Sequence, residues 1–480
     1  MKKWYITTTL PYVNADPHIG FALEIIEADV LARFKRRVGF DVFFNTGTDE
    51  HGLKIYRKAI EEGKDPQEYC NEYAVKFDDL RKALDLTYTN FIRTTDDTHK
   101  KTAQKFWSKC YENGDIYKKN YKSKYCVGCE LEKTDSELED GRCPIHPKLD
   151  IEILEEENYF FKFSNYQQKL LDLYNSQPDF VIPDYRLKEI KLFVEGGLED
   201  FSISRLKNKM PWGVPVPDDP EHVMYVWFDA LVNYISAIGW LDDSTKFKGW
   251  WPVVQIAGKD NLRQQSAIWQ AMLMSAGVTP SRQIFIHGFI TSDGKKMSKS
   301  LGNVVSPFDL VQKYGVDATR YYLLREIPAY SDGDFSYDRF DQLYNADLAN
   351  GLGNLVSRVA KLSSTLGLTL NMHEKKDRGV RGIEEYLNIY RFDLALEWLW
   401  QQITLLNKYL DDKKPWKQEA DDAKETLQNV ICGKEDLVSL LEIAEALSPF
   451  IPATSQKIKE VFVEDTIKEL SEPLFMRIIS

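Results

Sequence analysis

The sequence predicts an α/β protein in which a parallel sheet is divided by a long insertion and followed by an all-helical region. Strand and helix patterns alternate at the start of the chain, and short apolar strands return at Val253 to Ile256 and at Ile284 to Ile286. After about residue 345, leucines recur at helical spacing instead. With 480 residues, 43 % of them hydrophobic, the chain is too apolar for disorder and too long for one core, so two to four domains are expected.

The first elements follow from local sequence. Residues Trp4 to Leu10 are rich in β-branched and aromatic side chains, which predicts a buried strand. Asp16-Pro17 offers an N-cap followed by proline at the first helical position, which predicts a helix that runs to about Val38. Val42 to Asn45 predicts a second strand, and another helical stretch starts at about Leu53. This order indicates parallel strands joined by crossover helices.

Breaks in these patterns set the expected domain boundaries. Residues 117–150 lack hydrophobic periodicity and hold three of the six cysteines. The predicted segments are 1–116 and 223–290 for the two halves of the sheet, 117–222 for the insertion, 291–345 for a lysine-bearing linking region, and 346–480 for the helical region. The apolar positions that define this last region are Leu348, Leu352, Leu355, Val359 and Leu362, then Leu394, Trp398 and Leu405, then Leu437, Leu440, Leu441, Ala444 and Leu447.

Composition bears on the class of protein. No apolar run approaches the roughly 20 residues that a membrane-spanning helix needs, and no secretory signal is expected. Six cysteines in a chain of this size fit a reducing, cytoplasmic location. The net charge of −12 is unusual for a protein that binds nucleic acid, yet the window from Lys100 to Lys124 is strongly basic. That window is either a phosphate-binding stripe or a solvated lysine-rich face, and charge alone does not decide.

The first chemical motif is Pro17-His18-Ile19-Gly20-Phe21, just after the first predicted strand. A helix start collects unpaired N–H groups and the positive end of the helix dipole, so it attracts phosphate. His18 in the first turn would donate to a phosphate oxygen, and Gly20 would let a nucleotide approach. The alternative is a histidine that only caps the helix.

The second motif is Lys296-Met297-Ser298-Lys299-Ser300, preceded by Asp293-Gly294-Lys295. It reads as a polar loop that follows a strand ending near residue 290. Mobile ammonium groups on a glycine-containing loop suit the triphosphate of a nucleotide, where charge builds on the leaving pyrophosphate. A solvated lysine loop is the less specific alternative.

The third motif is Gly258-Lys259-Asp260, between a predicted strand and a predicted helix from Asn261. The carboxyl end of a parallel strand is where such sheets bind ligands. Asp260 would contact a ligand there, or it would cap the following helix.

A fourth group has the spacing of a metal site. Cys126 and Cys129 form one close pair, Cys143 and His146 form another, and 13 residues separate the two pairs. Four soft ligands in this order suit a closed tetrahedral zinc site, and Asp140-Gly141 between them suits the turn of a knuckle. Because all four positions are filled by protein, the expected zinc is structural.

The first two motifs together resemble the paired signature of class I aminoacyl-tRNA synthetases. The resemblance implies that ATP is bound by His18, Gly20, Gly258, Asp260, Lys296, Ser298 and Lys299. Among these, His18, Gly20, Lys296 and Lys299 would stabilise the transition state of adenylate formation, with Mg²⁺ accompanying ATP. The family's first motif usually ends in a second histidine, where this sequence has Phe21.

Further segments resemble one family of that class, the methionyl-tRNA synthetases: Thr9 to Asn14, Asn45 to Gly52 and Val226 to Ala230. The resemblance runs through nearly the whole chain. It implies that Asp49 receives the ammonium group of methionine. It implies a methionine pocket walled by Leu10, Tyr12, Trp227, Ala230, Tyr234, Gln265 and Trp269. The family commonly has histidine where this sequence has Gln265, and proline where it has Leu231.

The resemblance also covers the helical region. Asn354, Arg358 and Trp416 match the family's anticodon-reading positions, and unpaired bases are read by stacking and by hydrogen bonds to their edges. The implied fold is a split Rossmann-like parallel-sheet catalytic domain with a zinc-knuckle insertion, followed by an all-α anticodon-binding bundle. The implied function is to activate methionine with ATP and transfer it to the 3′-terminal adenosine of tRNA(Met), initiator and elongator, as a monomer. The rivals are another class I synthetase and a non-catalytic tRNA-binding relative.

Overall fold

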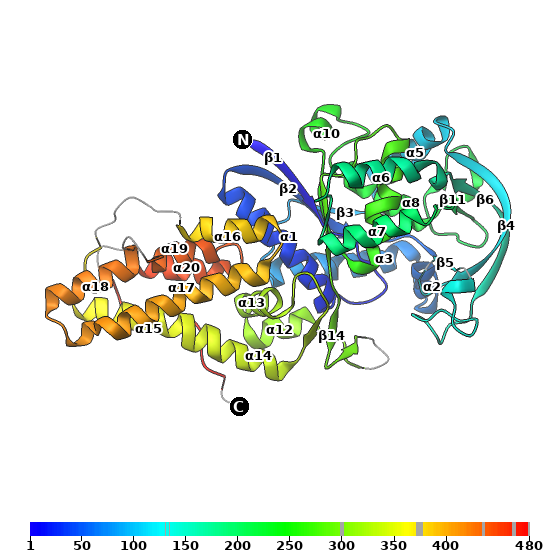
Figure 1. Ribbon diagram of the computed structural model, residues 1–480. Coiled ribbons are helices and arrows are strands. Elements are labelled where there is room, and N and C mark those ends of the chain that lie inside the picture. Colours follow the sequence, from blue (N-terminus) through cyan, green and yellow to red (C-terminus); the bar gives the residue numbers. More distant parts are fainter. Residues whose placement is uncertain are drawn as a thin grey trace. The chain divides into compact units, whose positions relative to one another are not determined.

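The computed structural model describes residues 1–129, 131–133, 135–297, 302–370, 378–433, 437–462 and 467–478. The chain divides into two compact units (Figure 1). Unit 1 comprises Met1–Pro17, Val38–Arg81 and Thr87–Ile286, and unit 2 comprises His18–Arg37, Lys82–Leu86 and His287–Ser480. Each unit is described by itself below.

Unit 1 is built on a sheet with the strand order β3-β2-β1-β12-β13-β7. The pairs β3–β2, β2–β1, β1–β12 and β13–β7 are parallel, as the sequence predicts. The strands are β1 (Lys2–Thr7), β2 (Phe40–Thr48), β3 (Asn90–Arg93), β7 (Val181–Ile182), β12 (Val254–Gly258) and β13 (Gln283–His287). The helices of the first half are α2 (Leu53–Glu61), α3 (Pro66–Asp78) and α5 (Asp97–Glu112). β1 ends at Thr7, three residues earlier than predicted.

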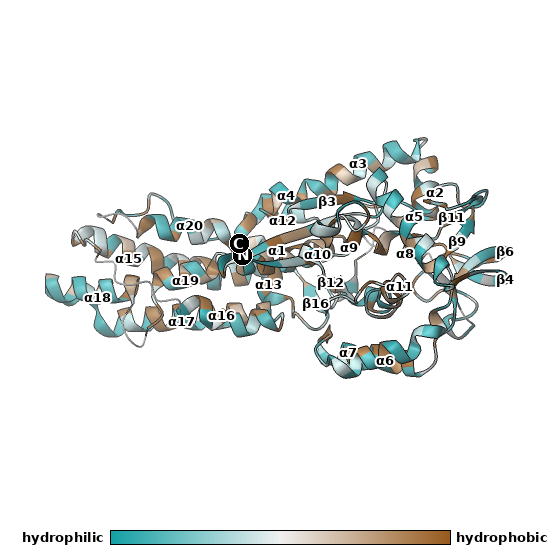
Figure 2. Cartoon of the chain, turned by 90° about the horizontal axis from the view of Figure 1, so that it is seen from above, coloured by the Kyte–Doolittle hydropathy of each residue, from teal (hydrophilic) through white to brown (hydrophobic). Residues whose placement is uncertain are grey.

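The insertion carries its own antiparallel sheets. Long strands β4 (Ile116–Cys126) and β6 (Glu152–Phe161) pair from Ile116 opposite Phe161 to Tyr125 opposite Glu152. Their charged residues colour them largely teal in Figure 2. The remaining elements are β5 (Leu131–Lys133), β8 (Phe201–Ser202), β9 (Ser204–Leu206), β10 (Pro215–Val216), β11 (Asp219–Met224), α6 (Gln167–Ser176) and α7 (Asp184–Glu195).

One strand of the insertion belongs to the main sheet. β7 pairs in parallel with β13, Val181 opposite Ile284 and Ile182 opposite Phe285. The sequence predicts no strand here, because a two-residue strand has no periodicity to detect. The predicted insertion 117–222 therefore supplies the edge strand of the main sheet that lies beside β13.

The second half of unit 1 continues with α8 (Val226–Leu231), α9 (Asn233–Ser236) and α10 (Ser244–Trp250). The helix expected from Asn261 is wrong in detail. Lys259–Asn261 is a 3-10 turn, Gln264–Ile268 is a π-helix, and the regular helix α11 is Trp269–Ser275. A π-turn widens the helix by one residue and is often found at functional sites.

Unit 2 contains α1 (Ile19–Arg37), which starts later than the predicted Asp16-Pro17 cap. The His18 carbonyl accepts from Phe21 and Ala22 at 3.1 Å each, so His18 is the capping residue. The Ile19 N–H is occupied instead by the carbonyl of Val305, at 3.1 Å. That tertiary hydrogen bond fixes the start of the helix.

The rest of unit 2 joins a small sheet to a helical bundle. The sheet has the order β15-β14-β16, with β14 (Ile290–Ser292), β15 (Lys295–Lys296) and β16 (Gly333–Phe335). The helices are α12 (Pro307–Tyr314), α13 (Val316–Glu326), α14 (Tyr337–Leu343), a π-helix (Tyr344–Gly353), α15 (Asn354–Thr365), α16 (Arg378–Asn388), α17 (Phe392–Lys413), α18 (Ala420–Cys432), α19 (Leu440–Leu447) and α20 (Pro452–Val461). None of the helices in the described ranges is both long and apolar enough to cross a membrane.

The core of the bundle differs from the predicted stripe in α17. The buried positions are Phe392, Ala395, Leu396, Leu399, Trp400, Ile403, Leu406 and Leu410, whereas Leu405 is exposed. Trp398 packs instead against α16, where a Cβ on Gly382 would lie 2.1 Å from the Trp398 ring. α17 is apolar on more than one face, so periodicity alone could not select the buried one. Leu348, Leu352, Leu355 and Val359 are buried as expected.

Candidate active site

The carboxyl edge of the parallel sheet brings several predicted residues together in unit 1. β1 and β12 are adjacent, parallel and in register, with Thr7 opposite Gln255. Leu10 and Tyr12 follow β1, and Gly258 closes β12, so both loops leave the same edge of the sheet. From β1 the strand order continues to β2 and β3 on one side and to β12 and β13 on the other, so the order of the strands reverses at β1. Ligands of open α/β sheets bind at this position.

Asp49 follows β2 at the same edge. Its backbone N–H donates to the carbonyl of Pro11 at 3.0 Å, and its carbonyl accepts from Val13 at 3.3 Å, which ties it to the loop after β1. The residue is only 3 % exposed. A buried carboxylate requires a nearby positive charge or donors. The place of Asp49 therefore suits the ammonium group of an amino acid.

Aromatic side chains of the loop after β1 and of α8, α9 and α11 form two ring pairs in unit 1. The rings of Tyr12 and Trp227 meet edge to face with centroids 6.3 Å apart, and those of Tyr234 and Trp269 are 5.8 Å apart. Among the described residues, the indole N–H groups of Trp227 and Trp269 have no hydrogen-bond partner. Ala230 lies on α8 with Trp227. Apolar and aromatic walls with few polar groups suit a thioether side chain.

Gln265 lies in the π-helix and joins this group through hydrogen bonds. Its Nε2 donates to the hydroxyl of Tyr234 at 2.8 Å, and its Oε1 accepts from Gln255 Nε2 at 2.6 Å. The Ser281 hydroxyl donates to Gln255 Oε1 at 2.6 Å. These contacts join Tyr234, Gln265, Gln255 and Ser281 in one buried hydrogen-bonded chain. Gln255 and Ser281 are not among the predicted site residues, although a glutamine inside an apolar strand is a signal that could have indicated the first.

A second group of buried polar side chains surrounds Asp229, which lies on α8. Asp229 accepts from His51 Nδ1 at 2.6 Å and from His99 Nε2 at 2.9 Å, and His99 Nδ1 lies 3.0 Å from the Ser236 hydroxyl. Burial raises the pKa of Asp229, but the charges and hydrogen bonds of the two histidines outweigh it and lower that pKa to about 2. The ionised carboxylate therefore joins α8 to α5 and to the segment after Asp49. Asp229 and His99 are not among the site residues predicted from the sequence.

The motif around His18 lies in unit 2. The Gly20 N–H donates to His18 Nδ1 at 3.0 Å, so the imidazole folds back over the start of its own helix. A Cβ on Gly20 would lie 2.8 Å from His18 Cε1, so only glycine leaves room for this contact. The structure thus contains the capping contact named as the alternative, while the exposed ring remains within reach of solvent.

The lysine motif begins as a hairpin and not as the predicted loop. β14 and β15 are antiparallel, with Thr291 opposite Lys296. Asp293 and Gly294 have φ of 52° and 72°, the left-handed pair that a tight hairpin turn favours. The backbone of Lys296 thus lies in β15. Ser298 and Lys299 lie outside the described residues.

The four predicted metal ligands converge in unit 1. The ligand atoms of Cys126, Cys129, Cys143 and His146 all lie within 4.8 Å of one another. Cys129 Sγ is 3.5 Å from Cys143 Sγ and 3.2 Å from His146 Nδ1. Metal–sulfur distances of about 2.3 Å in a tetrahedron place the ligand atoms about 3.5–3.8 Å apart, so one ion fits this set.

The surroundings of the cluster suit a metal as well. Burial raises the pKa of the Cys143 thiol, but nearby N–H groups of His146 and Ile145 and the Cys129 thiol outweigh it, and the net shift is downward. The thiolate is the form that binds metal. A Cβ on Gly128 would lie 2.5 Å from His146 Cγ, so the close turn requires glycine. Asp140 and Gly141 both have positive φ, as the predicted knuckle turn requires.

The predicted anticodon residues lie near one another in unit 2. The Arg358 guanidinium lies 5.4 Å from the ring centroid of Trp416 and pairs with Asp411 at 2.7 Å. Asn354 is exposed one turn before Arg358 on α15, and Trp416 is 45 % exposed. A tryptophan that only closed the end of the bundle would be covered, so this exposure supports a stacking surface.

The basic window of unit 1 is largely neutralised. Lys100, Lys109, Lys118, Lys122 and Lys124 each pair with a carboxylate, from Asp97, Glu112, Asp219, Glu155 and Asp135 respectively. Of the two alternatives left open by the sequence, the solvated lysine-rich face is the one that these pairs favour.

Comparisons with known proteins agree with this geometry. The family described as tRNA synthetases class I (M) matches residues 4–150 and 134–360. A methionine–tRNA ligase of Thermotoga maritima is 45 % identical over 95 % of this chain and 74 % of its own length. The corresponding enzyme of Thermosynechococcus vestitus is 45 % identical over 94 % of this chain and 88 % of its own. The solved Mycobacterium tuberculosis methionyl-tRNA synthetase in complex with methionyl-adenylate superposes with a TM-score of 0.90, at 38 % identity, over 96 % of this chain and 94 % of that one.

Proposed function

The chain belongs to the class I tRNA synthetases of the methionine type, and from this membership we propose that it joins methionine to tRNA(Met) in two steps. In the first step a methionine carboxylate oxygen attacks the α-phosphorus of ATP, and pyrophosphate leaves. In the second step a ribose hydroxyl of the terminal adenosine attacks the carbonyl carbon of the adenylate, and AMP leaves. No side-chain nucleophile is needed, so the rate comes from alignment and charge stabilisation.

The amino-acid site is carried by one observation above all: the buried Asp49 carboxylate lies beside the loop of Tyr12 at the carboxyl edge of the sheet. Asp49 would bind the ammonium group of methionine. The side chain would lie between Leu10, Tyr12, Trp227, Ala230, Tyr234 and Trp269, with Gln265 holding the Tyr234 hydroxyl in place. Methionine fits such walls because its thioether is apolar and polarizable.

ATP, with Mg²⁺, would be bound by the motifs at the helix start, after β12 and in the lysine hairpin. Gly258 and Asp260 would hold the ribose. His18 and Gly20 would contact phosphate at the start of α1, where N–H groups and the helix dipole favour negative charge. Lys296, Ser298 and Lys299 would stabilise the charge that develops on pyrophosphate.

The cluster of Cys126, Cys129, Cys143 and His146 would hold one structural zinc ion. Three sulfurs and one nitrogen that converge within 4.8 Å match the ligands and geometry that zinc prefers. The ion would tie the turn after β4 to the segment before β6. No step of the reaction passes through it.

The tRNA would be read by the helical bundle. Asn354 and Arg358 would hydrogen-bond the anticodon bases, and Trp416 would stack on one of them. We propose the predicted segments as its functional domains: 1–116 and 223–290 for catalysis, 117–222 for the knuckle insertion, 291–345 for the lysine motif and 346–480 for the anticodon. The protein would act as a cytoplasmic monomer on both initiator and elongator tRNA.

The test is amino-acid-dependent exchange between ATP and pyrophosphate, with methionine compared against leucine, isoleucine, valine and cysteine. Exchange with methionine alone is the expected result. Exchange with another amino acid would retain the reaction and overturn the pocket assignment. No exchange from folded, zinc-loaded protein that still binds tRNA would favour the non-catalytic relative, for which Phe21 and Gln265 are the motivating departures.

A further inference from the structure

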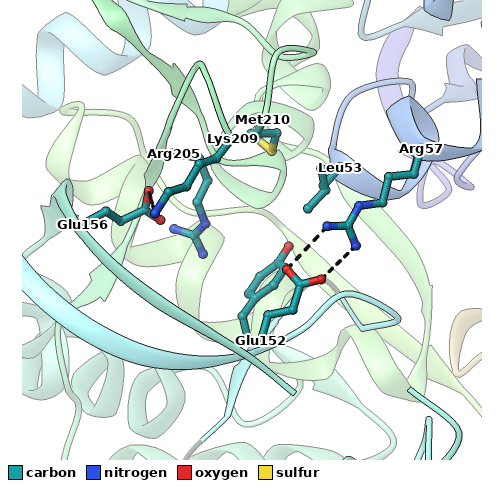
Figure 3. A pocket seen from close by; sticks show the side chains of 8 residues that line it. Leu53, Arg57, Glu152, Glu156, Arg205, Lys209 and Met210 are labelled. Atoms are coloured by element: carbon teal, nitrogen blue, oxygen red, sulfur yellow. Dashed lines mark hydrogen bonds and ion pairs between the residues drawn. The ribbon is translucent and has the colours of Figure 1, made fainter. Parts of the chain in front are cut away.

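Two groups of charged side chains lie outside the sites described so far. The first lines a cavity of about 210 Å³ in unit 1, where Figure 3 shows Arg57 and Glu152 facing each other. These two side chains form an ion pair at 3.0 Å, and Glu156 lies 3.7 Å from Lys209 Nζ. Each carboxylate that lines the cavity thus has a cation beside it.

The second group lies in unit 2 and is more deeply buried. Glu24 and Glu27 lie about one turn apart on α1, His287 is the last residue of β13, and none of the three is more than 5 % exposed. α1 starts at the motif of His18 and Gly20, and the chain after His287 leads into the hairpin β14–β15, where the lysine motif begins. This group therefore connects two segments that are both assigned to ATP.

The imidazole of His287 makes a hydrogen bond to each of these segments. Its Nε2 lies 3.0 Å from Glu24 Oε2 on α1, and its Nδ1 donates to the Gly288 carbonyl at 2.7 Å. Burial lowers the pKa of His287, but the hydrogen bond to Glu24 and the charges of Glu27 and Glu24 outweigh it and raise that pKa to about 9. Both ring nitrogens therefore carry a proton at neutral pH, and each proton has an acceptor.

The base of the hairpin is held on its other side by the segment before β16. The Phe289 N–H donates to Asp332 Oδ1, and the Phe289 carbonyl accepts from the Gly333 N–H, both at 2.9 Å. β14 then runs parallel to β16 and in register with it. The base of the hairpin is thus attached to β16 and, through His287, to α1.

The hairpin itself is braced at its turn. Asp334 Oδ1 accepts from the Gly294 N–H at 2.8 Å and from the Thr291 hydroxyl at 2.6 Å. β14 and β15 pair directly, with Thr291 opposite Lys296. An anchor at the base of such a braced hairpin therefore also determines where the backbone of Lys296 lies.

We propose that His287 is a positioning residue for adenylate formation, which holds the hairpin of the lysine motif in place against the helix that begins beside His18. Groups that stabilise a transition state must be placed closely, and a misplacement of about 1 Å can cost roughly a hundredfold in rate. The inference rests on the proposed function, since it requires that both motifs act on ATP. It adds a residue outside the proposed methionine, ATP and anticodon sets.

The two steps of the reaction separate this role from a purely structural one, because pyrophosphate leaves in the first step and takes no part in the second. His287→Gln and His287→Asn are compared in ATP–pyrophosphate exchange and in single-turnover transfer from preformed methionyl-adenylate to tRNA. The kcat of exchange is expected to fall about tenfold or more and the KM for pyrophosphate to rise. The KM for methionine and the rate of transfer should stay within about twofold of the wild type.

Two substitutions on α1 give a matched pair. Glu24→Gln replaces a charge-assisted hydrogen bond to His287 with a neutral one, so it should lower exchange about threefold or more and leave transfer unchanged. Glu27→Gln is the control, because Glu27 is a buried glutamate of the same helix, whereas the hydrogen bond of His287 is to Glu24. Both reactions of Glu27→Gln should stay within about twofold of the wild type.

Unchanged exchange in both His287 variants would overturn the inference, and so would equal losses of exchange and transfer, which indicate general damage to the fold. If neither His287 variant folds, the comparison of Glu24→Gln with Glu27→Gln decides by the same two assays. Equal exchange in these two variants would then overturn the inference.

A second measurement does not depend on catalysis. Hydrogen–deuterium exchange of the peptide that covers residues 288–296 should be about tenfold faster in His287→Asn than in the wild type, because the base of the hairpin loses its attachment to α1. Unchanged protection of this peptide would overturn the inference even in an active enzyme. A wild-type protein without ATP–pyrophosphate exchange would instead overturn the proposed function, whatever the protection of the hairpin.

Discussion

Gln265 Nε2 donates to the Tyr234 hydroxyl at 2.8 Å, and each of the two residues is 2 % exposed. The other end of the Gln265 amide is hydrogen-bonded as well, because its Oε1 accepts from Gln255 Nε2 at 2.6 Å. The Ser281 hydroxyl in turn donates to Gln255 Oε1 at 2.6 Å. A chain of neutral side chains thus orients the phenol, where the family commonly has a titratable histidine.

Gln265→Ala should raise the KM for methionine about tenfold in ATP–pyrophosphate exchange, because one buried hydrogen bond contributes about 0.5–1.5 kcal/mol and Tyr234 loses its orientation. Gln265→His is the control, since an imidazole N–H would donate to the same hydroxyl, and its KM should stay closer to that of the wild type. A KM unchanged in Gln265→Ala would remove this residue from the pocket.

Asp229→Asn should destabilise unit 1, because an amide would direct a donor at one of the two histidine nitrogens. The folded pKa of Asp229, about 2, lies below the ordinary value of 3.8, so its ionisation stabilises the fold above pH 4 and that stabilisation is lost as the pH falls toward 2. The loss at pH 7 should be on the order of 2–4 kcal/mol in urea unfolding. Equal stabilities of variant and wild type at pH 7 would contradict this role.

Glu27→Gln should stabilise unit 2 at neutral pH. Burial raises the pKa of Glu27 to about 8, although the charge of His287 acts in the opposite direction. The folded protein therefore keeps a proton that the unfolded chain releases above pH 4.5, and stability falls as the pH rises from 4.5 to 8. The gain in Glu27→Gln should be on the order of 2 kcal/mol at pH 8 and near zero at pH 4. A gain that did not vary with pH would have another cause.

His287 should stabilise unit 2 at neutral pH and lose that effect at alkaline pH, because its pKa is raised in the folded protein. Burial lowers its pKa, but the hydrogen bond to Glu24 and the charges of Glu24 and Glu27 outweigh this and raise it to about 9. Its contribution is full below pH 6.5 and is lost as the pH rises through 9. His287→Gln should therefore flatten the alkaline decline of unit 2 stability, measured by thermal unfolding between pH 7 and 10. A decline of unchanged steepness would mean that other groups titrate there.

Cys143→Ser should abolish zinc binding, measured as bound metal per chain by elemental analysis. Loss of one thiolate from a closed four-ligand site weakens binding strongly. Cys432→Ser is the matched control, because Cys432 lies in α18 and far along the chain from the cluster. Retention of one zinc per chain in Cys143→Ser would disprove the ligand set.

Trp416→Ala should weaken tRNA binding about tenfold or more without changing ATP–pyrophosphate exchange, since one stacked base contributes about 1–3 kcal/mol. Leu405→Ala is a suitable control, because Leu405 is a similarly exposed apolar side chain, 48 % against 45 %, in the same unit. Unchanged affinity in a filter-binding assay would show that Trp416 does not contribute to tRNA binding.

Elements with strong local signals could be predicted from sequence. β2 lies where the apolar run of Val42 to Asn45 lies, and α2 begins at the predicted Leu53. The four metal ligands also converge, because their spacing alone confines them to one knuckle. In each case neighbouring residues determine the structure.

Features set by distant contacts could not be predicted in the same way. α1 begins at Ile19 because the N–H of that residue donates to Val305, nearly 300 residues away. The role of Asp229 depends on His51 and His99 together. Lys299 and Ser298, assigned by resemblance, lie outside the described residues, so their roles stay predictions.

Because β7 forms one edge of the main sheet, the sheet depends on the insertion that contains this strand. Because Val181 and Ile182 pair with β13, excision of residues 117–222 would uncover the edge of the main sheet. Such an edge is a template for pairing with other chains. The insertion is therefore not a module that could be transplanted or deleted with its folding intact. Engineering of a smaller enzyme would have to keep residues near 181 or cap the edge of β13 with a new segment.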